Sequence, residues 1–149
     1  MTSNMYYLLA LIAGVALSTQ GGINAQLRTI VGNPAIASLV SFFIGALALM
    51  IYVMAFQPSS LGSISNLSSA SWHKWTGGIL GALFVTMVII IAPKIGSANM
   101  IGLIVAGQII SALFFDHFGM LGFAQHSINW ARIIGSVLLI GGVFLTVKN

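Results

Sequence analysis

The chain has 149 residues, of which 58% are hydrophobic and only 4% are charged, whereas a soluble domain carries about a quarter charged residues. Its mean hydropathy of +1.07 therefore predicts a protein whose solvent is lipid. The net charge of +4 comes from single, scattered basic residues, a pattern that does not indicate nucleic-acid binding. Cysteine and glutamate are absent and Asp116 is the only acidic residue, which excludes disulfides, thiol catalysis and cysteine-based zinc sites.

Five apolar stretches are each long enough to cross a bilayer as a helix, which takes about 20 residues. Helices are expected because lipid offers the backbone no hydrogen-bond partners. Asn33 and Pro34 suit the N-cap and the first position of the second helix, and Pro93 with Gly96 predicts a tight hairpin after the third. The sequence thus predicts an all-α integral membrane protein with a single five-helix domain over residues 1–149. The expected helices cover residues 5–27, 34–56, 74–93, 97–115 and 129–148.

Two longer breaks are expected as loops: the serine-rich residues 57–71 and the stretch 116–127 before the last helix. A different reading of the N-terminus is a signal peptide with Tyr7 to Leu17 as its apolar core. We favour a retained membrane helix, because no Lys or Arg precedes this core and the helical pattern continues to Leu27.

The basic residues barely distinguish the two sides of the membrane. With five spans, Lys74 and Arg132 fall on one side, and Arg28, Lys94 and Lys148 fall on the other. Orientation normally follows an asymmetry in Lys and Arg, and this distribution is nearly even. Either the chain has a weak single orientation, or copies insert both ways and pair as an antiparallel dual-topology homodimer. The second alternative gives the ten-helix inverted-repeat arrangement that many transporters share.

Small residues recur at helical spacing and predict close helix contacts, which in lipid favour association. They indicate either ordinary packing within one subunit or a compact bundle with a partner. The main examples are Ala10, Gly14, Ser18 and Gly22 in the first span, Ala37, Ser41 and Gly45 in the second, Gly77 and Gly81 in the third, and Ala131, Gly135 and Gly142 in the fifth.

A polar stripe runs along the first span, formed by Gln20, Asn24 and Arg28 at spacings of four residues. Amide and guanidinium groups are costly against acyl chains, so the stripe is expected to face a cavity or another polar helix. We predict that these three residues bind a solute. The alternatives are hydrogen bonds between helices for the two amides, and snorkelling to lipid headgroups for Arg28.

The fourth span contributes a second polar face, on which Gln108 and Ser111 are further candidates for solute binding. At its end, Asp116 and His117 form the chain's one carboxylate–imidazole pair in sequence and could couple transport to protons. The alternative for Asp116 is a structural role, as a helix cap or as a partner of His117 or a nearby lysine. No motif indicates a metal site.

Several stretches together resemble the YdcZ-like family, among them "GVALSTQGGINAQLR" and "APKIGSANMIGLIVAGQIISALFFDHFG". These are small five-helix proteins of the drug/metabolite transporter superfamily. The resemblance implies a multi-pass protein of the bacterial cytoplasmic (inner) membrane, transport by alternating access, and members that occur as balanced single genes, oppositely biased pairs or fused ten-helix forms. Smaller four-helix relatives exchange protons for cations through a glutamate in their first helix. This chain has Gln20, Asn24 and Arg28 there instead, which puts exchange of that kind in doubt.

The function predicted from these features is export of a small neutral or anionic metabolite by a secondary transporter, with a second copy of the chain as partner. A dual-topology anion or small-solute channel and an accessory subunit of a membrane complex are the alternatives. We expect no enzyme activity, because one aspartate and three scattered histidines supply neither a catalytic pair nor a metal triad. No cofactor is expected, since no glycine-rich phosphate loop is present.

Overall fold

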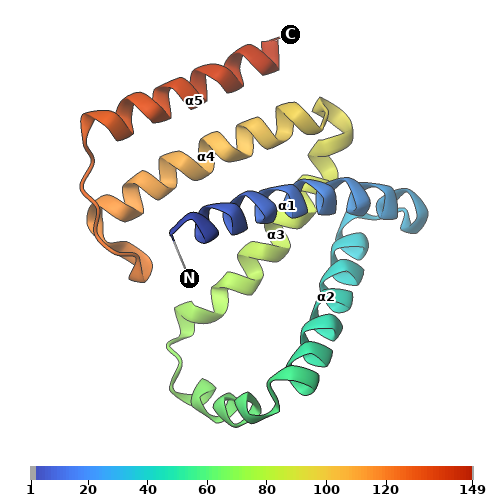
Figure 1. Ribbon diagram of the computed structural model, residues 1–149. Coiled ribbons are helices and arrows are strands. Elements are labelled where there is room, and N and C mark those ends of the chain that lie inside the picture. Colours follow the sequence, from blue (N-terminus) through green and yellow to red (C-terminus); the bar gives the residue numbers. More distant parts are fainter. Residues whose placement is uncertain (1–2, 149) are drawn as a thin grey trace. The chain divides into compact units, whose positions relative to one another are not determined.

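The computed structural model describes residues 3–148, and this part of the chain is helical, without strands. Five of its helices are long and apolar enough to cross a membrane, as the sequence predicts. They are α1 (Ser3–Val31), α2 (Pro34–Phe56), α3 (Thr76–Ile95), α4 (Ser97–Phe118) and α5 (Trp130–Lys148), with short 3-10 segments η1 (Pro58–Ser69), η2 (Trp72–Trp75) and η3 (Met120–Gly122) between them (Figure 1).

The helices divide between two compact units, one ending at Lys94 and the other starting at Ile95. The first unit contains α1, α2 and nearly all of α3, and the second contains α4 and α5. Whether the units together form the single domain expected from the sequence stays a prediction.

The boundary between α1 and α2 follows the expected capping chemistry. Gly32 adopts a φ of +74° after the last residue of α1, a conformation that glycine reaches without a Cβ penalty. The Asn33 side-chain oxygen accepts hydrogen bonds from the N–H groups of Ala35 and Ile36, at 2.8 and 3.2 Å. Pro34 follows as the first helical residue. The predicted N-cap and first helical position are therefore confirmed.

Several expected boundaries are wrong, and α1 continues past residue 27 to Val31. Residues 57–71 are not an irregular loop, because η1 covers most of them with i→i+3 turns in which serine hydroxyls bond to carbonyls three residues earlier. Pro93 does not break the third helix but lies inside the last turns of α3, and Gly96 alone separates α3 from α4. Helix α4 continues past residue 115 to Phe118, so Asp116 and His117 belong to its last turn.

The first unit has a small apolar core where its three helices meet. Ala37 of α2 and Val85 and Ile89 of α3 are buried, and Leu27 and Val31 of α1 pack against them. Large apolar side chains elsewhere in residues 3–148 are mostly exposed. In a soluble protein such exposure would be unfavourable, but here it matches the lipid contact that composition predicts.

The second unit is a pair of antiparallel helices (Figure 1). They approach closely at Gly102 of α4, where an added Cβ would lie 3.1 Å from a methyl carbon of Val143 on α5. A small residue thus permits close contact between these helices, as expected in lipid. Among the glycines of the predicted small-residue faces, a Cβ at Gly81 would lie 3.5 Å from the ring of Phe42 on α2. The others differ, because a Cβ at Gly14, Gly22, Gly45, Gly77, Gly135 or Gly142 would meet nothing within 4 Å among the described residues.

Candidate functional site

The polar stripe of α1 contains side chains in three different environments. Gln20 is exposed, Asn24 is only 4% exposed and Arg28 is partly buried. Spacings of four residues place all three on one side of the helix. The stripe predicted from the sequence is therefore one strip of α1 that passes from the surface at Gln20 to a buried amide at Asn24.

Asn24 is the buried member of the stripe, and its amide nitrogen Nδ2 has no hydrogen-bond partner among the described residues. A buried polar group without a partner costs about 1–3 kcal/mol, and such groups are rare in folded proteins. The alternative role for this amide, a hydrogen bond between helices, finds no acceptor for Nδ2 within residues 3–148. The side chain is thus available to donate to a molecule that the chain alone does not supply.

Gln20 lies one turn before Asn24 and lines a shallow cleft of about 310 Å³ between α1 and α2. Ser41 is the other polar residue of this cleft, and Phe42, Gly45, Ala46 and Leu49 complete its wall. The volume lies within the range of small-molecule sites, about 300–1,000 Å³. An amide in an apolar cleft of this size can orient a small solute by hydrogen bonding.

Arg28 has a partner that was not predicted. Its Nη1 donates a hydrogen bond to the main-chain carbonyl of Ile89 on α3, at 3.3 Å. This carbonyl lacks its usual helical donor, because the residue four positions later is Pro93, which has no N–H. Reading Pro93 together with the carbonyl four residues before it could have indicated an acceptor on α3, although not which side chain would reach it.

A second cleft opens beside this hydrogen bond, with a volume of about 410 Å³. Its walls come from the C-terminal parts of α1 and α3 and contain two cationic side chains, Arg28 and Lys94. Ala25, Thr29, Gly32 and Pro93 complete the lining. The sequence indicated a role for Lys94 only in membrane topology. Its side chain lines the same cleft as Arg28 because α1 and α3 end on the same side of the first unit.

The predicted residues of α4 lie in the second unit. The Ser111 hydroxyl donates to main-chain carbonyls of its own helix, at 2.8 Å from that of Gly107 and 3.2 Å from that of Gln108. The Gln108 side chain is exposed. Ser111 therefore already has acceptors, while Gln108 can still bind elsewhere. That these residues share a cavity with the stripe of α1 stays a prediction.

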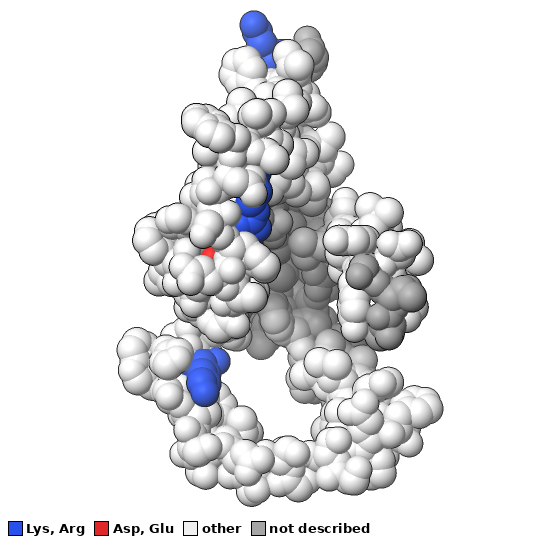
Figure 2. Space-filling model, turned by 60° about the vertical axis from the view of Figure 1, so that its left-hand side comes forward, with Lys and Arg blue, Asp and Glu red and all other residues white. Residues whose placement is uncertain are grey.

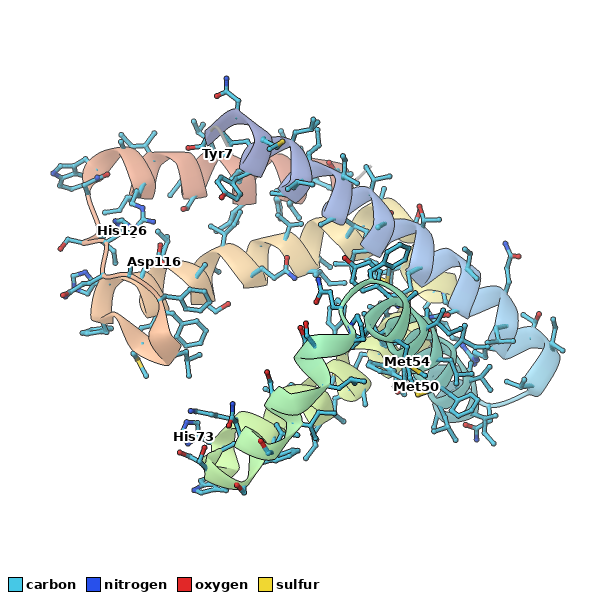
Figure 3. The ribbon with its side chains drawn as sticks, turned by 60° about the horizontal axis from the view of Figure 1, so that its bottom comes forward. Tyr7, Met50, Met54, His73, Asp116 and His126 are labelled. Atoms are coloured by element: carbon cyan, nitrogen blue, oxygen red, sulfur yellow. The ribbon has the colours of Figure 1, made fainter. Side chains whose placement is uncertain are left out.

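Asp116 is paired, but not with His117. Its carboxylate oxygen Oδ2 accepts a hydrogen bond from Nη2 of Arg132, at 2.5 Å, with side-chain exposures of 23% and 32%. The other terminal nitrogen of Arg132 donates to the carbonyl of His126, whose N–H donates to the carbonyl of Asp116. Figure 3 shows Asp116 and His126 near each other where α4 meets the following loop, and Figure 2 shows the chain's only acidic residue as a small red area near a basic side chain.

His117 takes part in the same loop through a different contact. Its ring nitrogen Nδ1 accepts a hydrogen bond from the N–H of Ile128, at 3.3 Å, and its carbonyl accepts one from Gln125. Both residues predicted to couple protons thus form hydrogen bonds that stabilise the segment connecting α4 to α5. The charge partner, Arg132, was missed because it lies 16 residues away in sequence.

No group of three or more His, Cys, Asp or Glu side chains within the described part of the chain could hold a metal ion.

Comparison with known proteins identifies the family. The family model described as "Putative inner membrane exporter, YdcZ" matches residues 5–145. The chain is also similar to the inner membrane protein YdcZ of Escherichia coli (strain K12), at 27% identity over 137 residues, which cover 92% of this chain and 91% of that protein. No solved structure matches the chain. With its five apolar helices, the protein is a multi-pass protein of the inner membrane, and it belongs to the YdcZ family of exporters.

Proposed function

We propose that the protein exports a small neutral or anionic metabolite by alternating access, with Gln20, Asn24 and Arg28 as its main solute-binding residues. The observation that carries this proposal is the unpartnered Nδ2 of Asn24, 4% exposed, on the same strip of α1 as Arg28. An exporter needs polar groups that exchange partners between solute and protein. A donor that has no partner in the chain meets this requirement at little cost, because no hydrogen bond within the protein must break first.

The proposed assembly is an antiparallel homodimer with dual topology. It is supported by the nearly even Lys and Arg distribution and by small-residue faces where a Cβ added at Gly14, Gly45, Gly77 or Gly135 would meet no described residue within 4 Å. Close backbone approach at such faces is a common basis of helix association in membranes. Two antiparallel copies would present one Arg28 toward each side, as alternating access requires. Gln108 and Ser111 would line the same cavity from α4.

A flux experiment tests the transport proposal. Purified protein is reconstituted in liposomes, and candidate solutes are first selected by the rise in unfolding temperature that binding causes. We expect slow, saturable flux that Asn24→Leu reduces, with Asn33→Ala as a control that changes an amide with a purely structural role. Flux that does not saturate would favour a channel, and no flux of any selected solute would favour an accessory subunit.

Topology is tested separately. A reporter active only in the cytoplasm and another active only outside are each fused to the C-terminus. The dual-topology proposal predicts signal from both fusions, and one or two lysines added on either side should fix a single orientation. Signal from only one fusion would exclude dual topology without affecting the transport proposal.

A further inference from the structure

The cleft between the C-terminal parts of α1 and α3 has an unusual composition for a membrane protein with so few charges. It contains two of the chain's five Lys and Arg residues, Arg28 and Lys94, around a volume of about 410 Å³. Neither cation forms an ion pair within residues 3–148, where the only salt bridge joins Arg132 to Asp116. Asp116 is the only acidic side chain in the sequence, and it is paired with Arg132. The same copy therefore has no further carboxylate side chain that could neutralise the two cations.

Arg28 holds its present partner weakly enough to exchange it. The contact between Nη1 and the Ile89 carbonyl is 3.3 Å long and involves a neutral acceptor. Hydrogen bonds from guanidinium to an anionic oxygen are shorter, about 2.7–2.9 Å, and roughly twice as strong as neutral ones. The guanidinium has five N–H donors in a planar fork that matches a carboxylate or phosphate group. An anion in the cleft would therefore compete successfully for Arg28.

We propose that this cleft binds an oxyanion, a carboxylate or phosphate group, between Arg28 and Lys94. The proposal deepens the proposed function, from which it takes the role of Arg28, and it adds Lys94 and an anionic group on the solute. The Thr29 hydroxyl, which also lines the cleft, already donates to the carbonyl of Gln26 at 2.7 Å. The donors to the anion are therefore Arg28 and Lys94. Only one terminal nitrogen of Arg28 bonds to the Ile89 carbonyl, so other N–H donors of the guanidinium remain for the anion.

A simpler role for both cations is to offset the negative ends of α1 and α3, where basic side chains are favourable. Lys148 provides the matched control, because it is an exposed lysine in the last turn of α5. Lys94→Gln and Lys148→Gln each remove one lysine charge from the last turn of a helix. Only Lys94→Gln also removes a cation from the cleft, so anion binding distinguishes the two roles.

The experiment measures binding and no transport, so its result is independent of whether the protein exports the anion. Full-length protein in an uncharged maltoside detergent or in phosphatidylcholine nanodiscs is titrated with inorganic phosphate, and the unfolding temperature is followed. Native mass spectrometry measures retention of phosphatidylglycerol against phosphatidylcholine. We expect Lys94→Gln to weaken binding about tenfold, the effect of losing one charge-assisted hydrogen bond, and Lys148→Gln to leave it unchanged.

Pro93→Ala is the second variant, and it keeps both cations. Alanine restores an N–H that can bond to the Ile89 carbonyl, so Arg28 becomes freer and phosphate should bind at least as tightly as in the unmodified protein. Binding of free phosphate identifies a solute group, and retention of phosphatidylglycerol alone identifies a lipid headgroup; both support the site when Lys94→Gln weakens them. The proposal is overturned if neither anion binds, if Lys148→Gln weakens binding as much as Lys94→Gln, or if Pro93→Ala abolishes it.

Discussion

Asn24 and Arg28 in the first unit have no side-chain partners among the described residues, whereas the second unit pairs its acidic group with a basic one. In the first unit, Asn24 has a buried and unpartnered amide nitrogen, and Arg28 reaches only a main-chain carbonyl. In the second unit, Asp116 and Arg132 form an ion pair that two hydrogen bonds at His126 reinforce. Both units lie in the same largely apolar chain, so the difference is not one of composition.

This difference separates two uses of polar residues in a membrane protein. A paired group lowers the free energy of the folded state, and its removal is expected to destabilise the protein. An unpartnered buried group raises that free energy, and it persists in folded proteins chiefly where function needs it. Removing a polar group is therefore expected to raise the free energy of unfolding at Asn24 and to lower it at Asp116.

The largest effect is expected for Asn24→Leu, which replaces the unpartnered amide with an apolar side chain of similar size. We expect the free energy of unfolding to rise by about 1–2 kcal/mol, because the folded state no longer contains a buried amide without a partner. Solute binding or flux should fall at least about tenfold, since one hydrogen-bond donor is lost. Thermal unfolding in detergent and liposome flux measure the two effects on the same preparation.

Asn33→Ala is the control for this substitution, because Asn33 caps α2 through two hydrogen bonds. Its loss should cost about 1 kcal/mol and leave the affinity for the solute unchanged. If Asn24→Leu destabilised the protein as Asn33→Ala does, Asn24 would have a structural partner and the contrast between the units would disappear.

An effect on stability of similar size tests packing in the second unit. Gly102→Leu introduces a side chain where a Cβ alone would lie 3.1 Å from Val143, and overpacking of this kind typically costs 1–3 kcal/mol, so we expect about 2 kcal/mol. Gly135→Leu in α5 is the comparison, because a Cβ there meets nothing within 4 Å. Unfolding temperatures should fall for Gly102→Leu alone, while the proposed homodimer predicts that Gly135→Leu lowers the dimer fraction in cross-linking. Equal destabilisation by both would contradict the packing of α4 on α5.

A smaller loss, about 1 kcal/mol, is expected for Asp116→Asn, because the ion pair with Arg132 is partly exposed. Arg132→Gln should cost more, since it also removes the donor to the His126 carbonyl. In the double variant the two losses should not add. The same Asp116→Asn protein tests the proposed proton coupling: flux whose dependence on a proton gradient is unchanged would exclude Asp116 from that role.

The five helices could be predicted because the lipid solvent determines their length and composition. Lipid requires about 20 apolar residues per crossing and satisfied backbone groups, and both requirements are visible in local sequence. The cap at Asn33 and Pro34 is equally local. The η1 segment was missed because its serines close short turns through their own hydroxyl groups, at 2.8 Å between Ser65 and the Gly62 carbonyl, and composition alone does not distinguish such turns from irregular chain.

The candidate site could be predicted only in part, for a reason of geometry. A spacing of four residues places Gln20, Asn24 and Arg28 on one strip, but burial depends on the neighbouring helices, and these leave Gln20 exposed while Asn24 is buried. The bond from Arg28 to Ile89 spans 61 residues, and no local pattern encodes that distance. Contacts across long separations therefore need the structure, even where each residue type is noticeable in sequence.

The smallest effect is expected for Ser38→Ala, which tests a polar pair that does have partners within the first unit. The hydroxyl groups of Ser38 on α2 and Thr86 on α3 lie 2.8 Å apart, and each also lies within hydrogen-bond distance of a carbonyl of its own helix, Pro34 or Ala82. Two hydroxyl hydrogens cannot serve three contacts at once, so one contact is always without a proton.

Because one of the three contacts is always unmade, removing the Ser38 hydroxyl lets Thr86 donate fully to the Ala82 carbonyl. The net cost should therefore stay near the average for hydrogen bonds between membrane helices, about 0.6 kcal/mol. A double-mutant cycle with Thr86→Val on thermal unfolding measures this coupling. A coupling above about 2 kcal/mol would mean that the first unit, like the second, depends on paired polar groups, and Asn24 would then be the exception within its own unit.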